Sequence, residues 1–317
     1  MNKKHHILII DDVHPLFMSK LSGYSMEYVP DIVKDVLWDA MQEATILVMR
    51  TKLHMNADWI DRAPKLKLIA RLGSGMDNID VDYATTKGIH CINAPEGNRN
   101  AVAEQTIGTM LTLLSNVYKG DREVSQGVWD RKGNEGRELR NLTVGIIGYG
   151  SVGSRLAELL VGFGCEILAY DLYKNGFGNT QIKEVHLAEL QDRSDIVTIH
   201  VPLTNNSQNM VNDEFIDKMK KSFLLLNLSR GAVVNISALI NGIKSGKVLG
   251  VGLDVLPNEK LDTYTDEEQN NLSYLSDSKV VMISPHIGGI TKDAYIMLAE
   301  VLADKILKWD IRLPLVN

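Results

Sequence analysis

The feature that most constrains the fold is a glycine-rich turn, Gly148-Tyr149-Gly150-Ser151-Val152-Gly153, set between an apolar run and a helix-periodic run. We predict a strand over 143–147, a helix over 154–161 and a second strand over 167–170. A strand, a G-x-G-x-x-G turn, a helix and a strand in this order are typical of dinucleotide-binding α/β domains. The context is therefore more specific than the glycine pattern alone.

Each glycine of the turn has a physical task. Gly148 permits the tight turn, Gly150 lets a pyrophosphate approach the backbone, and Gly153 lets the helix pack closely on the strand. The amides near Ser151 and Val152 would then face the phosphates at the positive end of the helix dipole.

Asp171 follows the second predicted strand. A carboxylate there accepts hydrogen bonds from both adenosine ribose hydroxyls and repels a 2′-phosphate. No arginine follows it at once, and Lys174 is the nearest base. We therefore predict NAD as the cofactor rather than NADP.

The composition is that of a globular protein with ordinary surface charge. Of the 317 residues, 44% are hydrophobic and 23% are charged, which is enough for two domains. The net charge of -6 argues against nucleic acid or an anionic membrane as the main partner. The apolar run 7–10 stops at Asp11 and Asp12, too short for a secretory signal or a membrane span, so we expect a cytoplasmic protein. Cys91 and Cys165 have no metal or redox spacing; we expect buried, reduced thiols and no metal.

Short apolar runs alternate with helix-periodic segments along the whole chain, which predicts an α/β protein with parallel sheets. We expect strands at 7–10, 46–49, 68–70, 90–92, 144–147, 167–170, 196–200, 224–227, 250–253 and 280–283. One long helix is expected over 100–118, a loop over 127–136 and a closing helix over 294–309. The acidic segment 258–277 is expected to be a solvated loop with a helical turn, except at Glu259.

Polar groups suited to chemistry follow three of the later strands. Arg230 follows the strand at 224–227, Asp254 and Glu259 follow the strand at 250–253, and His286 follows the strand at 280–283. Ligands of open parallel sheets bind outside the carboxyl ends of the strands, so we expect these groups to line one crevice.

The ordered motifs GYGSVG, NLSRGAVVN, GLDVLPNE and SPHIGG resemble those of the D-isomer-specific 2-hydroxyacid dehydrogenase family. The resemblance covers nearly the whole chain. It implies an NAD-binding Rossmann domain, residues 99–289, inserted into a smaller flavodoxin-like substrate-binding domain made of residues 1–98 and 290–317. It also implies a homodimer. Lys260 and Ser284 depart from the family, which commonly has proline and threonine there.

By this resemblance, His286 would remove the hydroxyl proton as hydride leaves C2 of a hydroxy acid. Glu259 would orient the imidazole and favour its protonated form. Arg230 would bind the substrate carboxylate and the C2 oxygen with its fork of donors. Asp254 resembles the acid that holds the nicotinamide carboxamide.

Further positions are expected to contact the cofactor or to serve the structure. We expect additional cofactor contacts from Ser74, Val201, Pro202, Leu228, Ser229, Arg230, His286 and Gly289. The histidines outside the catalytic set are expected to be structural: His5, His6, His14, His54, His90, His186 and His200.

Three segments bear on the substrate. The glycine-rich turn 71–78 would hold a carboxylate through Ser74 and Gly75, or would be a tight turn alone. Arg50, in a stretch similar to that of phosphoglycerate dehydrogenases, is expected to bind a phosphate or carboxylate, although Lys52 is shifted. The segment 127–139 also resembles that branch; Arg131 there is a second phosphate candidate or a plain surface charge.

These cues favour D-3-phosphoglycerate and 3-phosphohydroxypyruvate as the substrate pair, with a role in serine biosynthesis. A glyoxylate/hydroxypyruvate reductase or another D-2-hydroxyacid dehydrogenase is the alternative. A more remote one is an NAD-sensing, corepressor-like binding protein, which shares the fold and the catalytic residues.

Overall fold

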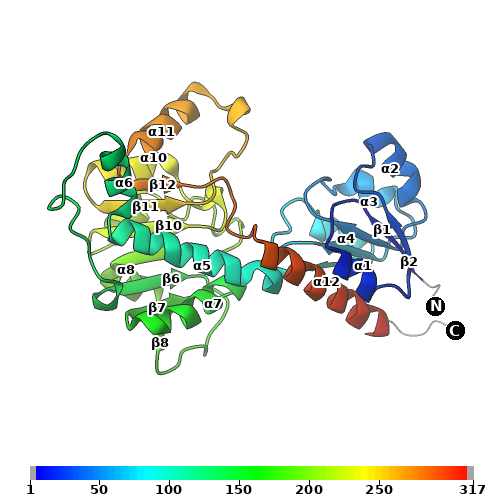
Figure 1. The fold of residues 1–317 in the computed structure, drawn as a ribbon. Coiled ribbons are helices and arrows are strands. Elements are labelled where there is room, and N and C mark those ends of the chain that lie inside the picture. The colour runs from blue at the N-terminus through cyan, green and yellow to red at the C-terminus, as the bar shows by residue number, and fades with distance from the viewer. Residues whose placement is uncertain (1–4, 313–317) are drawn as a thin grey trace. The chain divides into compact units, whose positions relative to one another are not determined.

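The computed structural model describes residues 5–312, and these form two compact units. Unit 1 runs up to Arg99 and resumes at Ile290, and unit 2 runs from Asn100 to Gly289. Each unit is an α/β domain built on its own parallel sheet (Figure 1). In the described part of the chain, no helix has both the length and the apolar character that crossing a membrane requires.

Unit 1 contains a five-stranded parallel sheet in the order β2-β1-β3-β4-β5. The strands are β1 (His6–Ile9), β2 (Ser25–Tyr28), β3 (Ile46–Met49), β4 (Leu68–Arg71) and β5 (His90–Asn93). The chain moves from β1 to β2 on one side and then returns to β3 on the other, so the order reverses between β1 and β3. This is the flavodoxin-like order, in which ligands bind at the reversal.

Helices cover both faces of this sheet. The helices of unit 1 are α1 (Pro15–Lys20), α2 (Lys34–Met41), α3 (Ala57–Asp61), α4 (Val81–Thr86) and α12 (Lys292–Arg312). Phe17 of α1 and Leu302 of α12 share one core cluster with Ile7 of β1. Trp59 of α3 and Leu8 of β1 belong to the cluster on the opposite face. The closing helix α12 thus packs on the first domain, which makes that domain discontinuous.

Unit 2 contains a seven-stranded parallel sheet in the order β12-β11-β10-β9-β6-β7-β8. The strands are β6 (Thr143–Ile147), β7 (Glu166–Tyr170), β8 (Ile182–Glu184), β9 (Ile196–Ile199), β10 (Phe223–Asn227), β11 (Val248–Leu253) and β12 (Val281–Ile283). The order reverses between β6 and β9, as in a Rossmann fold. The predicted doubly wound α/β architecture is confirmed.

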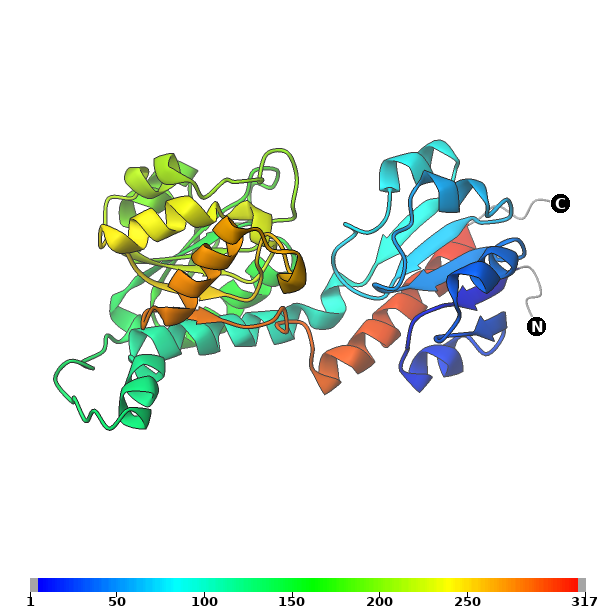
Figure 2. The ribbon, with the colours of Figure 1, turned by 90° about the horizontal axis from the view of Figure 1, so that it is seen from above.

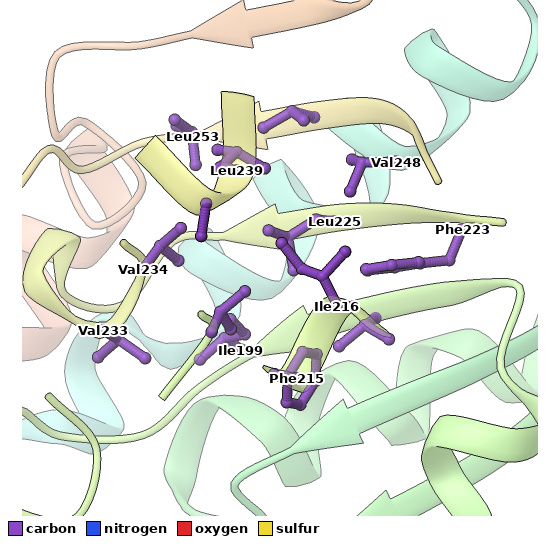
Figure 3. Close-up of a cluster of buried hydrophobic side chains, with 14 of the residues drawn as sticks. Ile199, Phe215, Ile216, Phe223, Leu225, Val233, Val234, Leu239, Val248 and Leu253 are labelled. Carbon is purple, nitrogen blue, oxygen red and sulfur yellow. The ribbon is translucent and has the colours of Figure 1, made fainter. Parts of the chain in front are cut away.

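Helices also lie on both faces of the second sheet (Figure 2). They are α5 (Pro95–Leu114), which begins in unit 1, α6 (Val117–Ser125), α7 (Ser151–Leu160), α8 (Leu187–Arg193), α9 (Asp213–Lys218), α10 (Ile236–Lys244) and α11 (Asp266–Asp277). Short 3₁₀ turns lie at Leu139–Asn141, Val161–Phe163, Gly231–Val233 and Leu261–Thr263. Phe215 of α9 and Leu239 of α10 pack with Leu225 of β10 in one core cluster (Figure 3). Met110 of α5 and Leu156 of α7 pack in the cluster on the other face.

The expected helix over 100–118 is wrong in its extent. The first helix starts earlier, at Pro95, and ends at Leu114, and a separate helix begins at Val117. Asn116 between them has φ = 53°, a left-handed conformation that ends a right-handed helix and that asparagine tolerates better than most residues.

Two strands and one helix were not expected. Strands β2 and β8 lie at sheet edges, where each pairs with only one neighbour. Their residues, Ser25–Tyr28 and Ile182–Glu184, are largely polar or exposed.

The segment 258–277 was expected to be a loop with one helical turn, yet Asp266–Asp277 is a full helix. Its N-cap residue Thr265 forms a capping box with Glu268. The cysteines Cys91 and Cys165 are free, as expected, but half-buried rather than buried.

Candidate functional site

The glycine-rich turn joins β6 to α7 in a conformation that its glycines require. Gly148 has φ = 97°, and a Cβ atom there would lie 2.5 Å from the carbonyl oxygen of His200. A Cβ atom on Gly153 would lie 1.9 Å from the carbonyl oxygen of Gly148. By contrast, a Cβ atom on Gly150 would meet no atom within 4 Å. Two glycines therefore keep the turn compact, and the third leaves its surface open.

The open surface coincides with the start of a helix. Gly150 is the N-cap of α7, and no described side chain caps it, so the first amides of the helix, including those of Ser151 and Val152, have no side-chain acceptor there. Exposed helix amides beside an uncovered glycine fit the pyrophosphate of a dinucleotide.

Asp171 lies directly beyond β7, beside this turn. Its Oδ2 accepts the amide of Tyr149 at 2.7 Å, and its Oδ1 accepts the amides of Tyr173 and Lys174 at 2.9 and 3.0 Å. The half-buried carboxylate is held in place by three backbone donors. Two of them bind Oδ1, so Oδ2 retains a further acceptor position for a ribose hydroxyl. The ammonium of Lys174 donates to the carbonyl oxygen of Tyr149 at 3.0 Å.

The segment after β10 is shaped by Asn227, which is fully buried. Its Oδ1 accepts the amide and the hydroxyl of Ser229 at 3.0 and 2.8 Å, and its Nδ2 donates to the carbonyl oxygen of Arg230 at 2.9 Å. The backbone of Arg230 is thereby fixed at the carboxyl end of the strand. Its Nη1 donates to the carbonyl oxygen of Ser229 at 2.7 Å, and its side chain is half-buried.

Asp254 is 2% exposed and organises the loop after β12. Its Oδ1 accepts the Ser284 hydroxyl at 2.5 Å and the Ile287 amide at 3.0 Å, and its Oδ2 accepts the Gly288 amide at 2.7 Å. Gln105 of α5 also donates to Oδ1, at 3.0 Å. The carboxylate therefore connects β11, α5 and the loop that carries His286.

His286 adopts a left-handed backbone conformation, with φ = 55°. Its amide donates to the carbonyl oxygens of Asp254 at 2.7 Å and of Ser284 at 3.0 Å. A non-glycine residue held in this region is uncommon, and such strain is often found at functional sites. The packed loop thus aims the imidazole at the cost of backbone strain.

The imidazole of His286 is paired with Glu259. Nδ1 of His286 lies 2.9 Å from Oε2 of Glu259, and the two side chains are 47% and 46% exposed. A carboxylate only accepts hydrogen bonds, so Nδ1 carries the proton and Nε2 of the neutral ring keeps its lone pair. The structure brings together the predicted histidine and glutamate from loops that are 27 residues apart.

The remaining expected cofactor positions of unit 2 lie at the same carboxyl edge. Pro202 follows β9, and its carbonyl oxygen accepts the hydroxyl of Ser207 at 2.6 Å. Val201 packs against the core, and Leu228 is buried. Gly289 is the last residue of unit 2.

In unit 1, Asp11 and Arg50 meet where the strand order reverses. Oδ2 of Asp11 accepts the amide of Arg50 at 2.6 Å and the amide of Lys52 at 3.4 Å. Nδ2 of Asn78 donates to the carbonyl oxygens of Arg50 and Leu53 at 3.1 and 2.8 Å. Asn78 thus acts structurally, as a brace for the loop after β3.

A second carboxylate, Asp12, lies on the same edge. It accepts the hydroxyl of Tyr295 at 2.7 Å and that of Tyr28 at 2.9 Å. Hydrogen bonds from Tyr295 and Tyr28 hold the pKa of Asp12 below its usual range, and the Arg50 guanidinium adds a smaller effect. The cations after β3 are therefore balanced in part by carboxylates.

The turn at 71–78 also forms as a tight structure. A Cβ atom on Gly73 would lie 2.1 Å from Nη1 of Arg71, so the guanidinium lies against the turn. Ser74 is held twice: its hydroxyl contacts Oδ1 of Asn98, and its carbonyl oxygen accepts Nδ2 of Asn93 at 2.5 Å. Gly75 next to it is half-buried.

Several supporting residues were not singled out from the sequence: Asp11, Asn227, Gln105, Asn258 and Tyr264. Asn227 is the first residue of the NLSRGAVVN motif and ends a strand, and this position is the sequence signal that could have indicated its role. Gln105 lies in a helix 149 residues before its partner Asp254, and no local pattern reveals that contact.

The segment 127–139, whose sequence resembles that of phosphoglycerate dehydrogenases, is mostly exposed. Trp129 is 79% exposed and Arg131 is exposed on the loop after α6. Among residues 5–312, no group of three or more histidine, cysteine, aspartate or glutamate side chains is arranged to hold a metal ion.

Comparisons with known proteins agree with this geometry. Residues 107–288 match the NAD-binding domain of the D-isomer-specific 2-hydroxyacid dehydrogenases. The chain is 36% identical to a hydroxypyruvate reductase of Thermotoga maritima over 87% of this chain and 88% of that protein. It is 33% identical to a D-3-phosphoglycerate dehydrogenase of Methanocaldococcus jannaschii. That match covers 95% of this chain and 57% of the longer relative.

A solved structure extends the likeness to the fold. The D-lactate dehydrogenase of Aquifex aeolicus, in complex with NAD and lactic acid, superimposes with a TM-score of 0.83 at 28% identity, over 97% of this chain and 95% of that one. The matched domain, the glycine turn, Asp171 and the His286–Glu259 pair lead to one conclusion. The chain belongs to the D-isomer-specific 2-hydroxyacid dehydrogenase family, whose cofactor is NAD.

Proposed function

We propose that this dehydrogenase acts on a three-carbon D-2-hydroxy acid, with D-3-phosphoglycerate and 3-phosphohydroxypyruvate as its preferred pair. The observation that carries the reaction type is the His286–Glu259 pair on the strained loop. The phosphate preference is supported by Arg50 and Lys52 at the strand reversal of unit 1 and by likeness to phosphoglycerate dehydrogenases. This activity would place the protein in serine biosynthesis.

When bound, NAD takes up the hydride from C2 of the hydroxy acid and returns it in the reverse direction. We propose that Nε2 of His286 removes the proton of the C2 hydroxyl in the oxidation and returns it in the reduction. Glu259 stabilises the protonated imidazole through Nδ1, so the ring stores the proton between steps.

Arg230 is proposed to bind the substrate carboxylate and the C2 oxygen. Buried Asn227 fixes the backbone of Arg230, so the guanidinium extends from a rigid position. A planar guanidinium forms two parallel bonds to a carboxylate, which sets the orientation of C2. Asp254, by contrast, is nearly buried and its oxygens bind the His286 loop, so we propose that it acts mainly by holding that loop.

In unit 1 we propose Arg50, Ser74 and Gly75 as substrate ligands. Arg50 carries a charge at the end of β3, and the turn at Ser74 is held in place by Asn93 and Asn98. The side chain of Arg50 would recognise the phosphate, and the turn would recognise the carboxylate.

Hydroxypyruvate and D-glycerate form the second candidate pair, because two observations favour an unphosphorylated substrate. Asp11 and Asp12 lie beside Arg50 and reduce the positive charge available to a phosphate. A hydroxypyruvate reductase is among the relatives of this chain, at 36% identity.

We also propose a homodimer that uses the surface of α6 and the following loop. Val117, Val124 and Val128 are about half exposed or more there, and Trp129 is 79% exposed. Large apolar side chains gathered on one surface mark an interaction site. Light scattering of the purified protein and of Trp129→Glu distinguishes a dimer from a monomer.

The test of the substrate is NADH oxidation with 3-phosphohydroxypyruvate, hydroxypyruvate and glyoxylate at matched concentrations. The proposal expects kcat/KM about tenfold or more higher for the phosphorylated acid, a difference of about 1.4 kcal/mol. In Arg50→Gln, that preference should disappear, while hydroxypyruvate turnover changes less.

Other outcomes have distinct meanings. Equal or better turnover of hydroxypyruvate contradicts the phosphate preference and leaves the reaction type standing. Absence of turnover with all three acids, together with intact NAD binding, contradicts the proposal that the protein is a dehydrogenase. It favours a corepressor-like binding protein.

A further inference from the structure

The catalytic pair is not held in place by burial. Nearly half of each side chain, Glu259 and His286, is open to solvent. An exposed carboxylate-imidazole contact contributes little by itself and leaves both side chains free to rotate. The geometry of the pair must therefore depend on what fixes the backbone of each partner. Asp254 fixes the loop of His286.

The backbone of Glu259 is fixed on both sides by side chains. The hydroxyl of Tyr264 donates to the carbonyl oxygen of Asn258 at 2.7 Å, which holds the peptide group before Glu259. Oδ1 of Asn258 accepts the amide of Lys260 at 3.0 Å, which holds the peptide group after it. The loop is thus locked at the two peptide bonds that determine where the Glu259 side chain starts.

This lock is connected to the helix that follows it. Nδ2 of Asn258 donates to Oγ1 of Thr263 at 3.0 Å and to Oε1 of Glu268 at 3.4 Å. Oε2 of Glu268 accepts the amide of Thr265 at 2.8 Å as part of the capping box of α11. The loop therefore rests on the first turn of α11.

The ring of Tyr264 is placed where it can act as an anchor. With Leu256, Pro257, Leu272 and Leu275 it lines a small apolar pocket between the loop and α11. Burial raises the pKa of Tyr264, and the carboxylates of Glu268 and Glu259 raise it further. The phenol consequently remains protonated and stays a donor across the working pH range.

We propose that Tyr264 is a positioning residue for the catalytic pair: its bond to the carbonyl oxygen of Asn258 holds Glu259 against Nδ1 of His286. Loss of this bond lets the carboxylate leave the ring and weakens its stabilisation of the imidazolium. The inference rests on the proposed role of Glu259 and His286. The charged groups of the surrounding loops are Glu259, Lys260, Asp262, Glu268 and, behind the loop of His286, Asp254.

The test compares Tyr264→Phe with Tyr274→Phe. The first variant removes one hydroxyl and keeps the ring in its pocket. The second removes a hydroxyl from α11 itself, where the ring of Tyr274 lies 5.0 Å from the ammonium of Lys244. Within residues 5–312, the Tyr274 hydroxyl makes no hydrogen bond to the Glu259 loop. Glu259→Gln, alone and combined with Tyr264→Phe, completes a double-mutant cycle.

The first readout needs neither substrate nor cofactor. Nitrogen NMR at one fixed alkaline pH follows the two ring nitrogens of His286, assigned by the loss of their signals in His286→Gln. Glu259 accepts from Nδ1, so we expect the Nδ1–H tautomer to lose population in Tyr264→Phe, in the direction of Glu259→Gln. Tyr274→Phe should keep the wild-type tautomer. The double variant should match Glu259→Gln, because Tyr264 acts through Glu259.

The second readout is hydroxypyruvate reduction with NADH. We expect kcat to fall about threefold to tenfold in Tyr264→Phe with little change in the KM for NADH, because the imidazolium is the proton donor in this direction. The same decrease should be absent when Glu259 is already glutamine.

The outcomes that overturn the inference are separable. If Glu259→Gln changes the tautomer of His286 and Tyr264→Phe does not, Tyr264 is only a packing residue. Additive effects in the double variant have the same meaning. If Glu259→Gln itself leaves the tautomer unchanged, the proposed role of the pair fails, and the inference fails with it.

Discussion

Asp254 accepts the backbone amide of Gly288 through Oδ2 at 2.7 Å, and this bond fastens the loop of His286 to the end of β11. The same carboxylate accepts the Ile287 amide and the Ser284 hydroxyl through Oδ1. One buried anion thus satisfies donors on both sides of a histidine whose backbone is strained. The strain of His286 is tolerated because its neighbours are fixed.

Asp254→Asn should destabilise the protein. The amide group of asparagine replaces one acceptor oxygen with a donor, which would face the amide of Gly288 or of Ile287. We expect the free energy of unfolding to fall by about 2–3 kcal/mol, since a buried donor loses its charged acceptor. Urea unfolding measures this. Ser284→Ala, which removes the bond to Asp254 at 2.5 Å and the bond from Gln105 at 3.1 Å, should cost about 1–2 kcal/mol. Equal stability of Asp254→Asn and the wild type would contradict the assignment.

Gly150→Ala and Gly153→Ala should separate folding from cofactor binding. Alanine at Gly150 meets no atom within 4 Å and has an ordinary φ of -83°, so the melting temperature should not change. Its methyl group enters the space offered to the pyrophosphate, and NAD affinity should fall about tenfold or more. The Cβ atom of an alanine at position 153 would lie 1.9 Å from the carbonyl oxygen of Gly148, so both stability and NAD affinity should fall.

Calorimetry measures the NAD affinity of the two variants, and thermal melts measure their stability. Unchanged NAD binding by Gly150→Ala would contradict the proposed pyrophosphate site.

The sequence predicted those parts of the site whose signal is local. The glycine turn, Asp171 and the residues after β10, β11 and β12 each follow an apolar strand, and the rule that ligands bind at carboxyl ends brought them to one edge. The central strands β6 and β10 are buried along their whole length and mostly apolar, so their positions were also predictable, to within one or two residues at their ends.

The parts that escaped prediction depend on distant contacts or on single backbone angles. Strands β2 and β8 are short and polar because an edge strand has one neighbour and one exposed side. The break at Asn116 depends on one left-handed residue in an otherwise helical pattern. Tyr264 and Asn258 lie in an acidic, polar segment that is typical of a loop, and their bonds to the Glu259 backbone are tertiary in origin.

Asp171→Asn should weaken NAD binding and relax the discrimination against NADP. The variant keeps the size of the side chain and loses the charge that would repel a 2′-phosphate and strengthen bonds to the ribose. We expect NAD affinity to fall about tenfold, since hydrogen bonds to charged groups contribute about 1.5–3 kcal/mol. The ratio of NADP to NAD affinity should rise. Lys174→Ala is the matched control, because its ammonium binds the carbonyl oxygen of Tyr149 instead. A constant NADP to NAD ratio in Asp171→Asn would show that another residue selects the cofactor.

His286→Gln should abolish most turnover and spare NAD binding. A proton donor or acceptor in the transition state contributes about 10²–10⁴-fold to the rate, so kcat for hydroxypyruvate reduction should fall by that factor. Glu259→Gln should fall less, by about tenfold, because the imidazole itself remains. His186→Ala, at a helix N-cap that makes no side-chain hydrogen bond, is a control histidine and should keep normal kcat. Normal kcat in His286→Gln is incompatible with the proposed chemistry.

His200 should make the protein less stable as the solution becomes mildly acidic. Burial lowers the pKa of His200 to about 3, from the ordinary 6.5, while its Nε2 contacts the hydroxyl of Thr198 at 2.9 Å. Between these values the unfolded chain binds a proton at this residue and the folded protein does not, so stability falls as the pH falls below 6.5. The loss approaches about 1.4 kcal/mol per pH unit, or about 2 kcal/mol from pH 6.5 to about pH 5, where most carboxylates are still ionised. Urea unfolding of the wild type and of His200→Gln at both pH values isolates this contribution, because all other groups titrate alike in the two proteins. The difference between the proteins should shrink toward acid pH; a constant difference would mean that His200 is protonated in the folded state as readily as in the unfolded chain.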